Sequence, residues 1–173
     1  SKSEAEAVIS ACKGQTATVK TMERVEKAEK APALYDLTTL QRDANRILGY
    51  TARQTLDYLQ SLYEKKMTTY PRTDSRYLTD DMEDSVKAIV LCAAGMLDVD
   101  APTVASPGQV CDSKKVSDHH AVIPTILASE ADLSGLPAGE REVLMLVCRQ
   151  VLMAVSESYR YEQTTAVIEC GGY

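Results

Sequence analysis

The stretch Thr68-Thr69-Tyr70-Pro71-Arg72-Thr73-Asp74-Ser75-Arg76-Tyr77-Leu78 separates two helical patterns, and the rest of the chain is arranged around it. Pro71 cannot occupy a helix interior, because its ring fixes φ and it has no backbone N–H to donate. The loop residues are mostly polar, whereas the segments on both sides carry apolar residues at helical spacing. A polar segment of this kind between buried helices is typical of a rigidly held loop that displays functional groups.

Tyr70 and Arg72 give this loop its chemical character. A tyrosine phenol is normally protonated at neutral pH, since its reference pKa is about 10. A guanidinium two residues away can stabilise a phenolate or bind a phosphate through paired hydrogen bonds. Phosphoryl transfer to tyrosine needs such a pair, and Asp74 can orient Arg72 or accept hydrogen bonds within the loop.

Composition and charge exclude several classes of protein. The chain of 173 residues is 45% hydrophobic and 25% charged, which is ordinary for a soluble globular protein of one or two domains. No window approaches the roughly 18 apolar residues of a membrane span. The net charge of −6 argues against a free-standing nucleic-acid binder and leaves a local basic patch open. Five cysteines without a Cys-x-x-Cys pair predict reduced thiols, a cytoplasmic location and no zinc site.

Periodicity predicts a mainly α fold with a minor β part. Helices are expected over residues 3–12, 36–49, 51–65, 79–95 and 138–156, and strands over residues 15–27 and 161–170. The simplest arrangement is a helical domain, residues 33–158, inserted between strands of a partial β-rich arch domain, residues 1–32 and 159–173. Because the chain begins at Ser1 and stops inside a strand pattern, we expect it to be a piece of a longer protein.

Capping residues and apolar faces refine these elements. Ser3 with Glu6 is expected to cap the first helix. Asp36 or Thr38 is expected to cap the second, which Gly49 ends. The predicted buried faces of the second and third helices comprise Leu37, Leu40, Ala44, Ile47 and Leu48, and then Thr55, Leu56, Leu59, Leu62 and Tyr63.

Three segments show no regular periodicity. Residues 27–32 are charged and end in a proline, which is typical of a linker. Residues 98–112 contain two prolines and a glycine, and they are expected to form an ordered but exposed excursion. The segment Lys114-Lys115-Val116-Ser117-Asp118-His119-His120-Ala121-Val122-Ile123-Pro124-Thr125 holds both histidines of the chain, side by side before a proline.

Three motifs together resemble the type IA DNA topoisomerases. They are Leu37-Thr38-Thr39-Leu40-Gln41, Thr68-Thr69-Tyr70-Pro71-Arg72-Thr73-Asp74-Ser75 and Asp118-His119-His120-Ala121-Val122-Ile123-Pro124-Thr125. With a proline directly after the tyrosine, this motif most resembles that of the topoisomerase III branch of the family. The resemblance covers essentially the whole chain, and the tyrosine motif is specific, because a run of defined residues this long rarely recurs by chance.

The resemblance implies catalytic roles for Tyr70, Arg72 and His119. In that family a tyrosine attacks single-stranded DNA and stays attached to the 5′ phosphate while another strand passes; the 3′ hydroxyl then reseals the break without ATP. Tyr70 would be the nucleophile, and Arg72 would contact the scissile phosphate. His119 begins the family's His-x-Ala-x-x-Pro pattern and can hold a phosphate or relay a proton. The family's tyrosine lies in a helical domain inserted between β segments of an arch.

Further side chains are candidate contacts for single-stranded DNA, the expected partner. Basic and polar side chains near the loop can contact the phosphates of the DNA strand. For each residue taken alone, a solvated side chain or a loop-stabilising hydroxyl is the simpler interpretation. The candidates are Thr69, Asp74, Ser75, Arg76, Lys114, Lys115 and Gln41.

The resemblance also implies groups that lie elsewhere in a parent protein. Type IA enzymes use an acidic, metal-binding domain and a further helical domain, and this chain shows no triad of the D-x-D type. The Mg²⁺ expected for the parent would therefore bind outside this chain, in which we expect no cofactor or metal site. The rest of the parent would be a partner, and in a bacterium the parent would lie on the nucleoid. We expect the chain alone to bind DNA weakly and not to relax it.

Other classes of function remain open. A non-catalytic helical module that grips single strands or a partner would keep its function in a Tyr70→Phe variant. A tyrosine recombinase would show several arginines with histidine and lysine and would join to the 3′ phosphate. A metal-dependent relaxase would show three clustered histidines, and the chain has only two. An unrelated structural protein is the last alternative.

Overall fold

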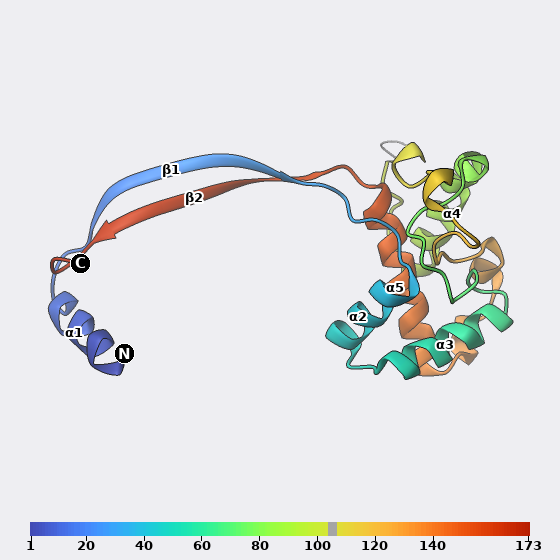
Figure 1. Cartoon of the computed structure of the whole chain (residues 1–173), viewed down its shortest axis with the longest axis horizontal. Helices are drawn as coiled ribbons and strands as arrows, with labels where there is room; N and C mark the ends of the chain where they lie inside the picture. The colour runs from blue at the N-terminus through green and yellow to red at the C-terminus, as the bar shows by residue number, and fades with distance from the viewer. Residues whose placement is uncertain (104–106) are drawn as a thin grey trace. The chain divides into compact units, whose positions relative to one another are not determined.

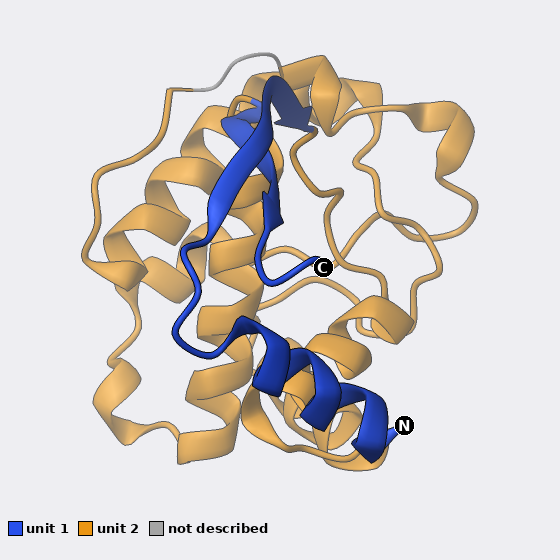
Figure 2. Ribbon diagram, turned by 90° about the vertical axis from the view of Figure 1, so that its left-hand side faces the viewer, with its two compact units in different colours: residues 1–29, 158–173 blue, residues 30–157 orange. Residues whose placement is uncertain are grey.

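The computed structural model describes residues 1–103 and 107–173, and the chain divides into two compact units (Figure 1, Figure 2). Unit 1 comprises Ser1–Glu29 and Ser158–Tyr173, and unit 2 comprises Lys30–Glu157. Part of the excursion predicted over residues 98–112 lies outside the described residues. The described fold is mainly helical with a small antiparallel sheet, so the predicted fold class is confirmed at this level.

Unit 1 contains helix α1 (Lys2–Cys12) and the strands β1 (Thr18–Glu29) and β2 (Tyr159–Glu169). The two strands pair antiparallel along their whole length, with a bulge between Val19 and Thr21 (Figure 1). All of β1 and nearly all of β2 are exposed. The pairing therefore rests on the backbone ladder and on cross-strand side-chain contacts.

Two local predictions for unit 1 are wrong. Helix α1 is capped by Ser1, whose hydroxyl accepts from the Glu4 N–H, and not by Ser3 with Glu6. The helix begins two residues earlier because Ser1 and Glu4 complete the capping box at that point. Residues 27–29, predicted as part of a linker, continue β1, since Tyr159 and its neighbours on β2 pair with them.

The described residues of unit 2 form four helices and five short 3₁₀ turns. The helices are α2 (Leu37–Leu48), α3 (Ala52–Glu64), α4 (Glu83–Leu97) and α5 (Ala138–Val155). The turns are η1 (Asp80–Met82), η2 (Pro107–Gln109), η3 (Ser113–Lys115), η4 (Ile126–Glu130) and η5 (Leu133–Gly135). Asp36 caps α2 by accepting from the Thr39 N–H at 2.6 Å, and Gly49 ends it with a φ of 75°, both as predicted.

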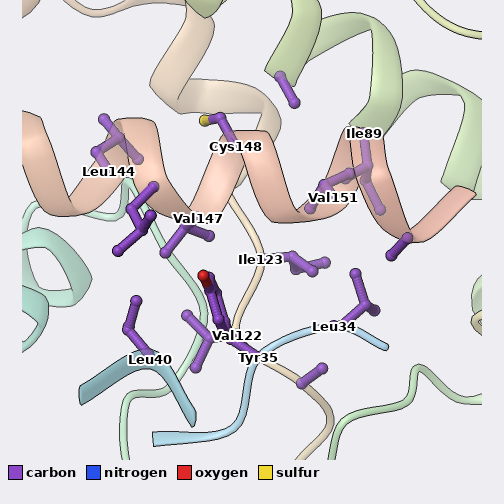
Figure 3. Close-up of a cluster of buried hydrophobic side chains, with 14 of the residues drawn as sticks. Leu34, Tyr35, Leu40, Ile89, Val122, Ile123, Leu144, Val147, Cys148 and Val151 are labelled. Atoms are coloured by element: carbon purple, nitrogen blue, oxygen red, sulfur yellow. The ribbon is translucent and has the colours of Figure 1, made fainter. Parts of the chain in front are cut away.

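The core of unit 2 forms around α5. Figure 3 shows Leu144 and Val147 on α5 on the side where Leu40, Tyr35 and Val122 lie. Leu144 and Val147 are fully buried, and Tyr35 is 2% exposed. A backbone hydrogen bond from the Val122 N–H to the Tyr35 carbonyl, 2.8 Å long, fastens the segment after the histidines to the start of α2.

Two residues predicted to be buried are exposed. Ile47 on α2 is 47% exposed and Tyr63 on α3 is 39% exposed. The inward face of α2 is already filled by Leu40 and Ala44, so that Ile47 lies at its margin. Tyr63 lies against the side chain of Tyr70 instead of the core.

The remaining composition-based predictions concern thiols and membranes. All five cysteines are free; Cys92, Cys111 and Cys148 are buried, whereas Cys12 and Cys170 are half-buried. Burial raises the pKa of the Cys148 thiol to about 12. Among the described residues, no helix combines the length and the apolar character needed to cross a bilayer.

Candidate active site

The loop that carries Tyr70 is fastened to the segment that follows the histidines. The Thr69 N–H donates to the Ile123 carbonyl at 3.0 Å, and the Thr69 hydroxyl donates to the Ala121 carbonyl at 3.0 Å. The same hydroxyl accepts from the Ile123 N–H at 3.0 Å. Thr69 thus joins two distant segments, and this fixes the backbone directly before Tyr70.

A left-handed turn at the end of α3 brings the loop back toward the helix. Lys66 has a φ of 59°, which is unusual for a residue with a side chain. The Met67 N–H donates to the Leu62 carbonyl at 2.8 Å, and the Lys66 N–H donates to the Tyr63 carbonyl at 2.8 Å. These bonds satisfy carbonyls at the helix end that have no partner within the helix.

After Tyr70 the loop alternates between buried and exposed residues. Pro71, Thr73 and Ser75 are buried, whereas Arg72 and Asp74 are exposed. This alternation is that of an extended segment with one face packed on the protein. It directs the two charged side chains to solvent, where they can meet a ligand.

The buried hydroxyl of Thr73 connects this loop to the first histidine. Thr73 Oγ1 donates to the His119 carbonyl at 2.8 Å and accepts from the Ser75 N–H at 3.1 Å. The Thr73 carbonyl accepts from the Leu37 N–H at 3.1 Å, which ties the loop to the start of α2. Ser75 adds a hydrogen bond from its hydroxyl to the Lys115 carbonyl at 2.9 Å.

These contacts place the rings of Tyr70 and His119 together. Their centroids are 4.2 Å apart with an angle of 36° between the rings, so the imidazole lies tilted over the phenol. Tyr63 approaches the phenol edge-on, with a centroid distance of 5.5 Å and an angle of 84°. Tyr70 is half-buried and His119 is exposed. The phenol is therefore held from two directions while part of it stays accessible.

Arg72 and His119 also line one hollow of about 450 Å³. The first residues of α2 form part of its wall, and the N-terminus of a helix favours negative charge. The full lining is Asp36, Leu37, Thr38, Arg72, Thr73, Asp74, Ser117, Asp118 and His119. Within the described chain Arg72 forms no ion pair, whereas Asp74 accepts from the Ser117 hydroxyl at 3.1 Å. Arg72 is thus free to pair with an anionic group, and Asp36, Asp74 and Asp118 are the acidic residues of the same lining.

Comparison with known proteins identifies the family of this chain. A sequence profile described as DNA topoisomerase matches residues 1–173. The chain belongs to the DNA topoisomerase family. The DNA topoisomerase 3 of Bacillus subtilis (strain 168) is 38% identical over 166 residues, which are 92% of this chain and 23% of that protein. The DNA topoisomerase 3 of Bacillus cereus (strain ATCC 10987 / NRS 248) is 36% identical over 178 residues, which are 98% of this chain and 24% of that protein.

A solved structure of low sequence identity has the same fold. The full-length topoisomerase I from Thermotoga maritima superposes with a TM-score of 0.68, covering 96% of this chain and 27% of that chain, at 21% identity. The chain thus spans about a quarter of the length of the curated relatives that it matches. The resemblance to type IA topoisomerases of the topoisomerase III kind is confirmed.

The other predicted DNA contacts of this topoisomerase chain lie outside the hollow, apart from Asp74. Arg76 is half-buried, and its Nε donates to the Leu34 carbonyl at 3.0 Å. The amide of Gln41 donates to the Ala52 carbonyl at 3.0 Å and joins α2 to α3. Arg76 and Gln41 thus stabilise the fold through hydrogen bonds to backbone carbonyls, as Thr69 and Ser75 also do. The contact of these four residues with DNA stays a prediction.

The two adjacent lysines differ in their surroundings. Lys115 forms an ion pair with Asp112 at 2.9 Å, and its ammonium lies 4.2 Å from the centroid of the Tyr77 ring. The hydrogen bond with Asp112 raises the pKa of Lys115 and lowers the pKa of Asp112. Lys114 is exposed. A DNA strand would therefore find Lys114 the more available of the two.

Sequence reasoning missed several residues of the site. Among them, Tyr63 was predicted to lie in the core, and Ser117, which donates to Asp74, was not singled out. Tyr63 has the helical spacing of the apolar face of α3, and this spacing is the same for a core residue and for a residue at the edge of the site. His120 is half-buried, and its Nδ1 lies 2.9 Å from the Ala121 carbonyl.

Metal ligands are a separate question in this family. Over residues 1–103 and 107–173, no cluster of three or more histidine, cysteine, aspartate or glutamate side chains could hold a metal ion.

Proposed function

We propose that this chain is the tyrosine-bearing part of a type IA DNA topoisomerase, an isomerase that cuts and reseals single-stranded DNA. The observation that carries the proposal is the contact between the rings of Tyr70 and His119 beside the hollow lined by Arg72. Tyr70, the proposed nucleophile, contacts the ring of His119, and His119 and Arg72 are both side chains that can bind phosphate. Family membership supports the same reading, and relatives named DNA topoisomerase 3 favour the topoisomerase III branch.

The proposed reaction has two balanced steps. In cleavage, the Tyr70 oxygen attacks the phosphorus, the bond from phosphorus to the 3′ oxygen breaks, and the phenol proton is lost while the leaving 3′ oxygen gains one. The product is a phosphotyrosine linked to the 5′ end and a free 3′ hydroxyl. In resealing, that hydroxyl attacks the phosphorus of the phosphotyrosine and loses its proton, the bond from phosphorus to the Tyr70 oxygen breaks, and the phenol regains a proton. The covalent intermediate conserves the phosphodiester bond, so the change in DNA topology needs no ATP.

Arg72 and His119 supply electrostatic stabilisation in this scheme. Arg72 is exposed and free of an ion pair within the described chain, so its guanidinium can form two parallel hydrogen bonds to the phosphate oxygens. Those oxygens accumulate charge in the transition state, where such donors contribute most. His119 faces the Tyr70 ring and lines the same hollow, from which it can hold the phosphate or relay a proton.

The complete activity belongs, in this proposal, to a longer protein. The chain spans about a quarter of its relatives, and its described residues offer no metal cluster. We therefore place the Mg²⁺ site and a further helical domain in other parts of the parent. Unit 2 is then the tyrosine domain inserted between strands of an arch domain to which unit 1 contributes. The parent acts in the cytoplasm, and the chain alone does not relax supercoiled DNA.

The test is to trap and locate the covalent intermediate in the full-length parent. The enzyme is mixed with Mg²⁺ and single-stranded oligonucleotides labelled at either end, denatured quickly and digested for mass spectrometry. A 5′-phosphate adduct on the Tyr70 peptide, absent in Tyr70→Phe and present in a Tyr159→Phe control, is the expected result.

The other outcomes of that experiment each overturn the proposal. A 3′ linkage would assign the protein to another class of tyrosine enzymes. An adduct on a different residue would remove Tyr70 from the reaction. No adduct at all, with single-strand binding retained, would favour a non-catalytic binding module.

A separate relaxation assay tests the 173-residue chain alone. Relaxation of supercoiled DNA by this chain would refute its dependence on the rest of the parent.

A further inference from the structure

Tyr63 occupies an unusual place at the end of α3. Its neighbours on the helix, Leu59 and Leu62, are fully buried, whereas Tyr63 is 39% exposed. Within the described chain its hydroxyl has no hydrogen-bond partner, so nothing ties the polar end of the side chain to the fold. The packing partner that the structure does provide is the ring of Tyr70, at a centroid distance of 5.5 Å and an angle of 84°.

Two aromatic neighbours of Tyr70 approach it in different ways. His119 lies tilted over the phenol at 4.2 Å, and Tyr63 meets it edge-on. Offset and edge-to-face arrangements are the favoured geometries for aromatic pairs. A tyrosine side chain has two torsions to fix, and one neighbour alone leaves the ring free to swing away from it.

The backbones that carry the two neighbours are themselves held. Tyr63 lies in the last turn of α3, and its carbonyl accepts from the Lys66 N–H at 2.8 Å. The carbonyl of His119 accepts from the buried Thr73 hydroxyl at 2.8 Å. The phenol of Tyr70 therefore contacts two rings whose backbones are held by hydrogen bonds.

We infer that Tyr63 is a positioning residue that holds the Tyr70 ring in the orientation from which it attacks DNA. The inference rests on the proposed function, since it gives Tyr63 a role only if Tyr70 is the nucleophile. Neither Tyr63 nor Tyr70 belongs to the lining of the hollow that Arg72 and His119 share. The aromatic contact of Tyr63 is with the Tyr70 ring, so we assign its role through that ring. Tyr63 makes this contact with its ring and not with its hydroxyl, so phenylalanine at position 63 should preserve the contact.

The expected effects follow from this geometry. Loss of one aromatic pair should lower the population of the correctly oriented Tyr70 roughly 2- to 12-fold. Tyr63→Leu in the full-length parent should therefore slow formation of the covalent adduct by a factor in this range. Tyr63→Phe should retain the wild-type rate. The affinity for single-stranded DNA should be unchanged in both variants.

The experiment combines single-turnover kinetics, binding and spectroscopy. Adduct formation is timed with a labelled oligonucleotide, and affinity is measured in a Tyr70→Phe background so that no cleavage occurs. The exposed tyrosine of unit 1, Tyr159, gives the matched control Tyr159→Leu. In parallel, the 173-residue chain is labelled with 3-fluorotyrosine, and the ¹⁹F resonance of Tyr70 is assigned by its loss in Tyr70→Phe.

A shifted Tyr70 resonance in Tyr63→Leu, with no shift in Tyr159→Leu, would establish the contact independently of activity. A slow adduct step with unchanged affinity and rescue by phenylalanine would establish the positioning role. Wild-type kinetics in Tyr63→Leu would overturn the inference and leave the proposed function intact. An affinity that falls in step with the rate would also overturn it, because Tyr63 would then be a DNA contact. An adduct on a residue other than Tyr70 would overturn both.

Discussion

Replacing Thr73 with valine should weaken the connection between the tyrosine loop and the His119 segment. The side chain is 6% exposed, and its hydroxyl serves the His119 carbonyl and the Ser75 N–H. Valine keeps the shape and leaves both groups without this partner. A buried polar group that loses its partner costs about 1–3 kcal/mol, so we expect a loss of about 2–4 kcal/mol in the free energy of unfolding.

Thr68 in the same loop is the matched control. It is 2% exposed, and within residues 1–103 and 107–173 its hydroxyl has no hydrogen-bond partner. A buried hydroxyl without a partner is unfavourable, so its replacement by a methyl group removes a cost. Thr68→Val should therefore leave the free energy of unfolding unchanged or raise it by about 1–2 kcal/mol.

The assay is thermal unfolding of the 173-residue chain, followed by circular dichroism at the helical signal of unit 2. For a unit of this size, 1 kcal/mol corresponds to about 3–4 °C in Tm, so Thr73→Val should lower Tm by about 6–16 °C. Equal Tm values for the two valine variants would refute the reasoning, because the substitutions differ only in whether the hydroxyl is engaged. In the full-length parent, Thr73→Val should also slow adduct formation, since His119 loses its anchor.

Two further predictions concern the backbone and pH. Lys66→Gly should raise the free energy of unfolding by about 0.5–1 kcal/mol, because the φ of 59° strains a side chain, and Gly49→Ala at a φ of 75° should lower it by a similar amount. Urea unfolding of the two variants measures these changes. Midpoints that move in the same direction in Lys66→Gly and Gly49→Ala would contradict the expected opposite effects. Burial, and then the hydrogen bond to Asp43, raise the pKa of Tyr35. Since the unfolded chain loses this proton near its ordinary pKa of about 10, the stabilisation is complete below that pH and is lost above it. Tyr35→Phe should therefore show a smaller fall in stability between about pH 10 and 12 than the wild type, and an identical fall would argue against the shift.

Local signals in the sequence predicted the secondary structure well. The cap at Asp36, the left-handed end at Gly49 and the strand alternation around Val19 act over a few residues, so they can be read without knowing the fold. The cap of α1 was misplaced by two residues because serines at positions 1 and 3 both fit the pattern, and helix ends are decided by small free energies.

The candidate site was found in part. The motif around Tyr70 gave the loop, and the resemblance to type IA topoisomerases, which the family match confirms, gave roles to Arg72 and His119. The sequence from Pro71 to Ser75 shows only a proline followed by polar residues. Which of these residues are buried depends on partners elsewhere in the chain, so the alternation of burial could not be predicted.

The sequence by itself determined the elements, the family and the chemical identity of the loop, because each depends on residues close together in the chain. Only the tertiary structure decided that Tyr63 leaves the core to meet Tyr70, and that Thr73 holds the His119 carbonyl. The Thr73–His119 contact joins segments far apart in the sequence, and the Tyr63–Tyr70 contact depends on the turn at Lys66 that returns the loop to α3. Whether two such segments meet is decided by how α5 and its neighbours fill the core, and no periodic pattern near Tyr70 carries that information.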